Sequence, residues 1–194
     1  MTAVLRLCAA LVVGALAGPA VALENAAPST PFPAAIGGPF ELQDTNGRTR
    51  TEADPDGRTQ LLFFGYANCP GMCPVALPLM AEITDTLAAD GIAVRPVMIT
   101  VDPGRDTPAA MAAALARFHP DFVGLTGNSA ALAKAYEAFS VAPEVMLDDP
   151  VAGAILAHAT QIFVLSAEGQ VMSVLPPVLP ADRLAGIVAR YAAN

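Results

Sequence analysis

The sequence predicts a single α/β domain in which helices flank a β-sheet of mixed strand direction. Segments with strand-like and helix-like spacing of apolar residues alternate through the middle of the chain, as they do in α/β folds. Two short apolar runs late in the chain surround a turn and predict a β-hairpin, which adds antiparallel strands to the sheet. The chain has 194 residues, of which 54% are hydrophobic, and this is enough for one substantial core.

The first 22 residues have the pattern of an export signal. Arg6 supplies a basic start, Leu7–Ala17 an apolar stretch, and Ala20–Ala22 a small-x-small cleavage site. The apolar stretch is shorter than the roughly 20 residues that cross a bilayer, so we expect cleavage near Leu23, with an uncleaved membrane anchor as the alternative. Cys8 lies within the signal and is expected to be removed with it, which leaves two cysteines.

Residues 23–38 are rich in Ala, Pro, Ser and Gly and predict a flexible tether, which leaves 39–194 as the domain. Without Arg6 the chain has 9 basic and 18 acidic side chains, a net charge of −9. Such an acidic protein is not expected to bind nucleic acid, and the charge suits a solvated surface. Export to the periplasm places Cys69 and Cys73 in an oxidising compartment, where two cysteines form a disulfide by default.

The domain is expected to begin with a small N-terminal hairpin. Phe40–Asp44 and Arg48–Glu52 flank Asn46-Gly47, a dipeptide that tolerates the positive φ of a tight turn. Gln60–Tyr66 then has the apolar composition of a buried strand.

The first predicted helix, Val75–Ala89, follows the two cysteines and ends at Asp90-Gly91, which is a helix stop. Pro78 fits poorly in its interior and predicts a kink or a late helix start. A second apolar strand is expected at Ile92–Val101.

Three charged residues, Asp102, Arg105 and Asp106, follow this strand. We expect them to cap the next helix, with Thr107 as the alternative cap, and to pair with one another; the alternative is that they modulate a bound metal or bind a partner. The remaining predicted elements are helices at Pro108–Phe118 and Asn128–Phe139, strands at Thr160–Leu165 and Gln170–Leu175, and a closing helix at Pro180–Tyr191. Asn128 or Ser129 is expected to cap the helix Asn128–Phe139.

This order of elements is the layout of a thioredoxin-like domain, in which a thiol pair follows a buried strand and a hairpin and a helix close the chain. The segment 102–159, about 58 residues, has room for two extra helices. We therefore predict a thioredoxin-like fold with an N-terminal β-hairpin and a helical insertion before the late hairpin. The topology alone leaves redox and metal functions open.

Cys69 and Cys73 are expected one turn apart at the start of the first helix. Residues four apart on an ideal helix have Cα atoms about 6.2 Å apart, near the upper end of the disulfide range. Two thiolates that share one metal ion have sulfurs about 4 Å apart, which one helical turn supplies well. The positive end of a helix favours thiolates in either case, so the spacing weakens the disulfide reading and favours a metal.

His158 lies directly before the predicted strand Thr160–Leu165 and is expected beside the start of the cysteine helix. Two thiolates and one neutral imidazole suit copper, because soft sulfur selects Cu+ and imidazole also serves Cu2+. By position alone, His158 is either such a ligand or a hydrogen-bonded structural histidine. His119, at the end of a predicted helix, is expected to be structural. Met146, in the expected loop Val145–Asp149, is a further soft ligand worth testing.

Four blocks of the chain resemble the Sco/SenC family of copper-binding thioredoxin-fold proteins. FGYANCPGMCP (Phe64–Pro74) is similar to that family's FGYTxCPDxCP, and TVDPGRDTP (Thr100–Pro108) to its SVDPxRDTP. FHPDFVGLTG (Phe118–Gly127) is similar to its FHPxFxGLTG, and HATQIFVLSAEGQ (His158–Gln170) to its HSxxxYLxDPxGx. The blocks occur in the family's order and span most of residues 60–175.

The resemblance implies that Cys69, Cys73 and His158 bind copper as Cu+, Cu2+ or both. It also implies delivery of copper to cytochrome c oxidase, at the dinuclear copper site of subunit II. Subunit II and other periplasmic copper chaperones are then the implied partners. The chain departs from the family pattern at Ala67, Gly71 and Ala157, where relatives often carry polar side chains that can orient metal ligands.

The leading hypothesis is an exported copper-binding assembly factor, without substrate turnover, in the periplasm or anchored to the inner membrane by its N-terminus. The alternative is a thiol-disulfide oxidoreductase that reduces the cysteines of the same oxidase site, with Cys69 as attacking and Cys73 as resolving thiol. The residues His158–Thr160 lack the proline of redox thioredoxins, which argues against a general disulfide exchanger. A peroxide-reducing enzyme is disfavoured because only the cysteine pair supports it.

Overall fold

The computed structural model describes residues 36–151 and 153–192 of the chain. The predicted export signal and most of the predicted tether lie outside these residues. The first described residues already belong to the folded domain. Ile36 packs against the core, and the Gly37 N–H donates to the Ala138 carbonyl at 2.7 Å. None of the helices in this part of the chain combines the length and the apolar character that crossing a membrane requires.

A central sheet of seven strands forms the middle of the domain, in the order β2-β1-β5-β4-β3-β8-β9. The strands β3, β4 and β5 run parallel, and the other pairs are antiparallel. The central strands β3 and β4 are buried along their whole length, as parallel strands covered on both faces should be. The bounds are β1 Glu41–Asp44, β2 Thr49–Thr51, β3 Thr59–Gly65, β4 Val94–Thr100, β5 Val123–Thr126, β8 Ile162–Leu165 and β9 Val171–Leu175.

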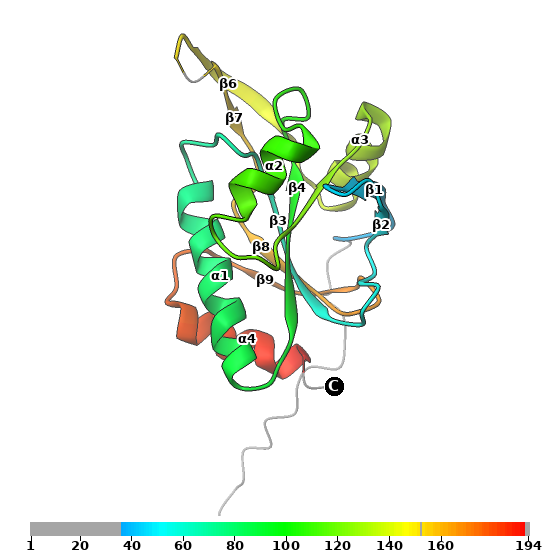
Figure 1. The fold of residues 1–194 in the computed structure, drawn as a ribbon, viewed down its shortest axis with the longest axis vertical. Coiled ribbons are helices and arrows are strands. Elements are labelled where there is room, and N and C mark those ends of the chain that lie inside the picture. Colours follow the sequence, from blue (N-terminus) through cyan, green and yellow to red (C-terminus); the bar gives the residue numbers. More distant parts are fainter. Residues whose placement is uncertain (1–35, 152, 193–194) are drawn as a thin grey trace, which may run out of the picture.

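The described residues form four helices: α1 Cys73–Ala89, α2 Pro108–Leu115, α3 Ser129–Ala138 and α4 Ala181–Ala192. The first three pack on this sheet, and α4 packs on α1. Helix α1 lies against β3, β4 and α4, whereas α2 lies against β5 and α3 against β1 (Figure 1). Successive side chains of β3 point to opposite faces. The Phe64 ring packs against Tyr136 of α3 and the adjacent Phe139, while Gly65 faces Cys73 at the start of α1, so helices cover both faces.

The predicted thioredoxin-like α/β fold is confirmed, and so is its N-terminal hairpin. The β1–β2 turn is built on Asp44, whose carboxylate accepts the backbone N–H groups of Asn46 and Arg48 at 2.8 and 3.0 Å. Gly47 supplies the positive φ of 78° that this turn requires. The predicted late start of the first helix is wrong, because α1 already begins at Cys73 and contains Pro78.

The predicted insertion contains more than helices. Strand β5 joins the central sheet between α2 and α3, and a second sheet is formed by the hairpin of β6, Glu144–Asp149, and β7, Gly153–Ala157. This β6–β7 hairpin projects from the end of the domain where β4 and α2 meet (Figure 1). Its side chains Val145, Met146 and Leu147 are 65, 72 and 57% exposed. Residues 145–149, expected to be a loop, are therefore a strand without a core face.

Candidate metal centre

Cys69 and Cys73 come from two different local structures. Cys73 is the first residue of α1, but Cys69 lies in the loop before it, held by a hydrogen bond from its N–H to the Tyr66 carbonyl at 3.2 Å. The expectation that both cysteines lie on one helical turn is therefore wrong for Cys69. Helix α1 begins only at Cys73, after its N-cap Met72, and Gly71 between the two cysteines is a weak helix former.

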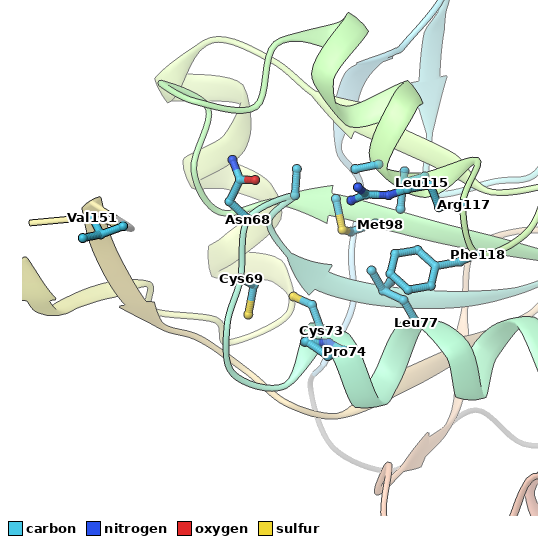
Figure 2. A pocket seen from close by; sticks show the side chains of 12 residues that line it. Asn68, Cys69, Cys73, Pro74, Leu77, Met98, Leu115, Arg117, Phe118 and Val151 are labelled. Atoms are coloured by element: carbon cyan, nitrogen blue, oxygen red, sulfur yellow. The ribbon is translucent and has the colours of Figure 1, made fainter. Parts of the chain in front are cut away.

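The structure nevertheless brings the three predicted site residues together. The sulfurs of Cys69 and Cys73 and a ring nitrogen of His158 all lie within 4.8 Å of one another, and Cys69 Sγ is 3.8 Å from His158 Nε2. The two cysteines are unpaired thiols, 8 and 3% exposed, and their sulfurs point toward each other (Figure 2). His158 is half-buried between β7 and β8.

The orientation of the His158 ring is fixed from both sides. Its Nδ1 lies 2.8 Å from the Ala159 carbonyl oxygen, and a carbonyl only accepts, so Nδ1 carries a proton. In the neutral ring Nε2 then has the free lone pair, and this atom faces Cys69. Edge-to-face contacts with the rings of Phe63 and Tyr66, at 5.7 and 5.9 Å, hold the imidazole in this position.

The electrostatics of the site favour a thiolate at Cys69. A hydrogen bond from the Cys73 thiol, together with donors from His158 and the backbone N–H groups of Cys73 and Gly71, lowers the pKa of Cys69 to about 3 against the cost of burial. The pKa of Cys73 is raised, because its proton is held in the bond to Cys69 and because it is buried. Burial lowers the pKa of His158, but its bonds to Cys69 and Ala159 outweigh this, so the pKa is raised.

Asp106 is a site residue whose role the sequence analysis missed. We expected it to cap the next helix or to pair with its neighbours, but the cap of α2 is Thr107, whose hydroxyl accepts the Ala110 N–H at 3.2 Å. Asp106 is instead 1% exposed and accepts the Ala67 N–H, two residues before Cys69, and the Thr100 hydroxyl at 2.7 Å. Burial raises the pKa of this carboxyl. Asp106 thus anchors the cysteine loop to the end of β4.

Arg105 connects the β6–β7 hairpin, which precedes His158, to the segment after β4 that also contains Asp106. The predicted pairing of Asp102 with Arg105 is confirmed, and the guanidinium also donates to the Ala154 carbonyl in the β6–β7 hairpin. It lies 5.6 Å from the centre of the Tyr66 ring, and the Tyr66 hydroxyl accepts the Leu156 N–H at 3.2 Å. These contacts hold β7, which leads directly into His158, against the strand that leads into Cys69.

Two glycines border the sulfurs. A Cβ added at Gly65 would lie 2.9 Å from Cys73 Sγ and 2.8 Å from the Phe63 ring, so the sulfur fills the space of a side chain. A Cβ at Gly71 would instead lie 3.8 Å from Cys69 Sγ, an ordinary contact. The chain therefore has room for a side chain at Gly71.

The other candidate residues lie outside this group. His119 Nδ1 accepts the Asp121 N–H at 3.1 Å and its Nε2 contacts Asp85 Oδ1 at 3.2 Å, which is the structural role expected of it. Met146 is exposed in β6. Two sulfurs and one imidazole nitrogen are a donor set that suits copper, whereas tetrahedral zinc asks for a fourth ligand.

These features define a class of protein, a thioredoxin-like domain with two thiols and an imidazole placed to hold a soft metal ion. The chain belongs to the SCO1/SenC family, whose sequence profile matches residues 28–193, and this confirms the resemblance of the four sequence blocks. A SCO2-like protein of Rickettsia conorii is 39% identical over 136 residues, which cover 70% of this chain and 66% of the relative. The chain spans about half to two thirds of the length of several curated relatives.

Solved structures agree with this assignment. The structure of Bradyrhizobium japonicum ScoI with copper bound matches with a TM-score of 0.72 and 33% identity, over 81% of this chain and 99% of that one. BsSco, described as having a disulfide switch and as a member of the Sco family of cytochrome c oxidase assembly proteins, shares the fold at 22% identity. Its TM-score is 0.63, over 84% of this chain and 95% of that one.

Proposed function

We propose that this protein is an exported copper-binding protein that delivers copper to the dinuclear copper site of cytochrome c oxidase subunit II. The observation that carries the proposal is the convergence of Cys69 Sγ, Cys73 Sγ and His158 Nε2 within 4.8 Å, with the His158 lone pair directed at the sulfurs. The copper-bound relative and the family's description as oxidase assembly proteins support it.

In this proposal Cys69 and Cys73 bind copper as thiolates and His158 as a neutral nitrogen. Thiolates favour Cu+, and the imidazole allows Cu2+ to be held as well. The protein acts in the periplasm, where other copper chaperones supply the ion and subunit II receives it. The N-terminal segment directs export and, if it is retained, holds the domain at the inner membrane.

The proposal is tested by copper titration of the reduced protein, with an electron paramagnetic resonance spectrum of the Cu2+ form. We expect one equivalent per chain, loss of binding in Cys69→Ser and Cys73→Ser, and at least tenfold weaker binding in His158→Ala. His119→Ala is the matched control and should bind as the wild type does, because its ring is occupied by Asp121 and Asp85. Unchanged binding in His158→Ala would show that the three-ligand site is wrong.

A second candidate, reduction of the subunit II cysteines, is favoured by one observation. The pKa of Cys69 is lowered and that of Cys73 is raised. A thiol-disulfide reductase needs such a difference, because the attacking thiol, here Cys69, must be a thiolate while the resolving thiol, here Cys73, stays protonated. A thiolate with so low a pKa is, however, a weak nucleophile and a good leaving group, so the dithiol is a poor reductant. Incubation of the reduced protein with oxidised subunit II separates the two functions, because the redox function does not need His158.

A further inference from the structure

A cleft opens from the two thiols along one side of the domain. Its volume is about 610 Å³, within the range of roughly 300–1,000 Å³ that is usual for ligand sites. The lining begins at Cys69 and Cys73, continues over Leu77 and Phe118, and also includes Val151 at the tip of the β6–β7 hairpin (Figure 2). An occupant of this cleft would therefore touch both the metal centre and two separate surface elements.

The cleft has buried apolar side chains in its wall and polar side chains, one of them a cation, at its rim. Leu77 and Met98 are buried in its wall, and Phe118 is half-buried. Arg117, just after α2, is exposed on the rim and forms no hydrogen bond or ion pair with any residue of 36–151 and 153–192. Buried arginines elsewhere, such as Arg95, are paired with carboxylates.

This cation stands out because the chain as a whole carries a net charge of −8. An anionic partner is repelled by most of such a surface, and an unpaired guanidinium beside the thiols is where it can approach. Asn68, exposed at the same rim, adds an amide that can both donate to and accept from a peptide backbone. Apolar walls, one cation and an amide together fit a short acidic stretch of polypeptide.

We propose that this cleft is the docking site for an extended acidic segment of a partner protein, which brings a cysteine sulfur to Cys69 while its carboxylate pairs with Arg117. The inference rests on the proposed function, since a partner that exchanges copper must present a sulfur to these thiols. Cys69 is only 8% exposed and lines the cleft, so the cleft offers that sulfur a route to it.

The test uses three pentapeptides that are capped at both ends and differ in one residue, Glu, Gln or Lys, placed one to three positions from a single cysteine. Each cysteine is activated as a mixed disulfide with pyridine-2-thiol, a neutral leaving group. The Cys69 thiolate of the reduced full chain attacks the peptide sulfur, a new disulfide forms, and pyridine-2-thione is released and measured by its absorbance. Cys73 can then displace the peptide as a thiol, which closes the Cys69–Cys73 disulfide.

We expect the Glu peptide to react about threefold to fivefold faster than the Gln peptide at low ionic strength, the Lys peptide to react slowest, and the differences to shrink in salt. Arg117→Gln should abolish the preference, and Arg117→Glu should reverse it. Arg183→Gln, which removes an exposed cation on α4 outside the cleft, should retain it. Equal rates for the three peptides with the wild type would overturn the proposal.

A small reagent separates peptide docking from simple attraction of an anion. If 3-mercaptopropionate, activated in the same way, shows as large a dependence on Arg117 as the Glu peptide does, the site binds only a carboxylate and the segment proposal is wrong. A copper titration of the wild type decides the proposed function independently, because the peptide rates are measured without metal.

Discussion

Both carboxylate oxygens of Asp106 accept the backbone N–H of Ala67, at 3.1 and 3.2 Å, across 39 residues of sequence. This pair joins the loop that carries Cys69 to the end of β4, where Thr100 donates its hydroxyl to the same carboxylate. The position of one sulfur of the candidate metal site therefore depends on a residue in another part of the chain.

Replacement of Asp106 should loosen the cysteine loop. Asp106→Ala leaves a buried N–H and a buried hydroxyl without their acceptor, and we expect a loss of about 2–3 kcal/mol in the free energy of unfolding, measured in urea. Asp106→Asn keeps one acceptor oxygen and should lose about 1 kcal/mol. Copper affinity should fall about tenfold in Asp106→Ala. Asp121→Asn, an exposed carboxylate, is the control, and an equal effect there would contradict this role.

Removal of the Arg105 guanidinium should release the β6–β7 hairpin. Arg105→Met keeps the length of the side chain but loses its bond to the Ala154 carbonyl. We expect backbone amides of β7 to exchange with solvent about tenfold faster, which corresponds to a local loss of about 1.4 kcal/mol, as followed by hydrogen exchange with mass spectrometry. Arg183→Met is the control on α4, and slow exchange of β7 in both variants would show that other contacts hold the hairpin.

The affinity for Cu+ should rise with pH in two stages. Above pH 4 Cys69 is already a thiolate, because its pKa is lowered to about 3, so copper displaces no proton from it. Cys73 and His158, whose pKa values are raised, must each lose a proton to bind. The apparent affinity should therefore rise about 100-fold per pH unit while His158 is protonated and about tenfold per unit above its pKa. Competition titrations with a Cu+ chelator between pH 5 and 9 measure this, and a thousandfold rise per unit would mean that Cys69 is an ordinary thiol.

A carboxylate at Gly71 should change the acidity of Cys69. The structure has room for the side chain, because a Cβ there lies 3.8 Å from Cys69 Sγ. In Gly71→Asp the added negative charge disfavours the thiolate, and we expect the pKa of Cys69 to rise by about one unit. Thiolate absorbance at 240 nm across an acid titration measures it. Gly71→Asn has the same shape without the charge, so its Cys69 pKa should stay close to that of the wild type. An equal rise of this pKa in Gly71→Asn would show that the polarity or the volume of the side chain, and not its charge, causes the effect.

The elements with a strong local pattern could be predicted from the sequence. In each of these elements, residues close together in the sequence determine the structure. Examples are the buried strand β3, the capping residues Thr107 and Asn128, and the Asn46-Gly47 turn. Strand β5 could not be found in this way, because it has four residues, one of them a glycine. Strands β6 and β7 have no buried face, so they lack the alternation that predicts a strand.

The three residues of the candidate site could be predicted from the sequence, but the residues that hold them in place could not. Cys69, Cys73 and His158 are chemically distinctive, and the order of strands places them together. The residues that fix them, Asp106 and Arg105, act through contacts 39 and 49 positions away, which no local spacing reveals. The helical arrangement expected for Cys69 was wrong because helix α1 begins only four residues later, at Cys73.

Gly65 lets the sulfur of Cys73 pack directly against the end of β3. The Cys73 sulfur occupies the volume that a side chain at Gly65 would need, between the Phe63 ring and the end of β3. In the proposed function, the atom that binds copper is therefore also a packing atom of the hydrophobic core, and loading of the ion would change the fit of that atom in the interior. Any redesign of this centre has to consider the core as well, because a larger or smaller atom at position 73 would also strain or hollow the interior of the domain.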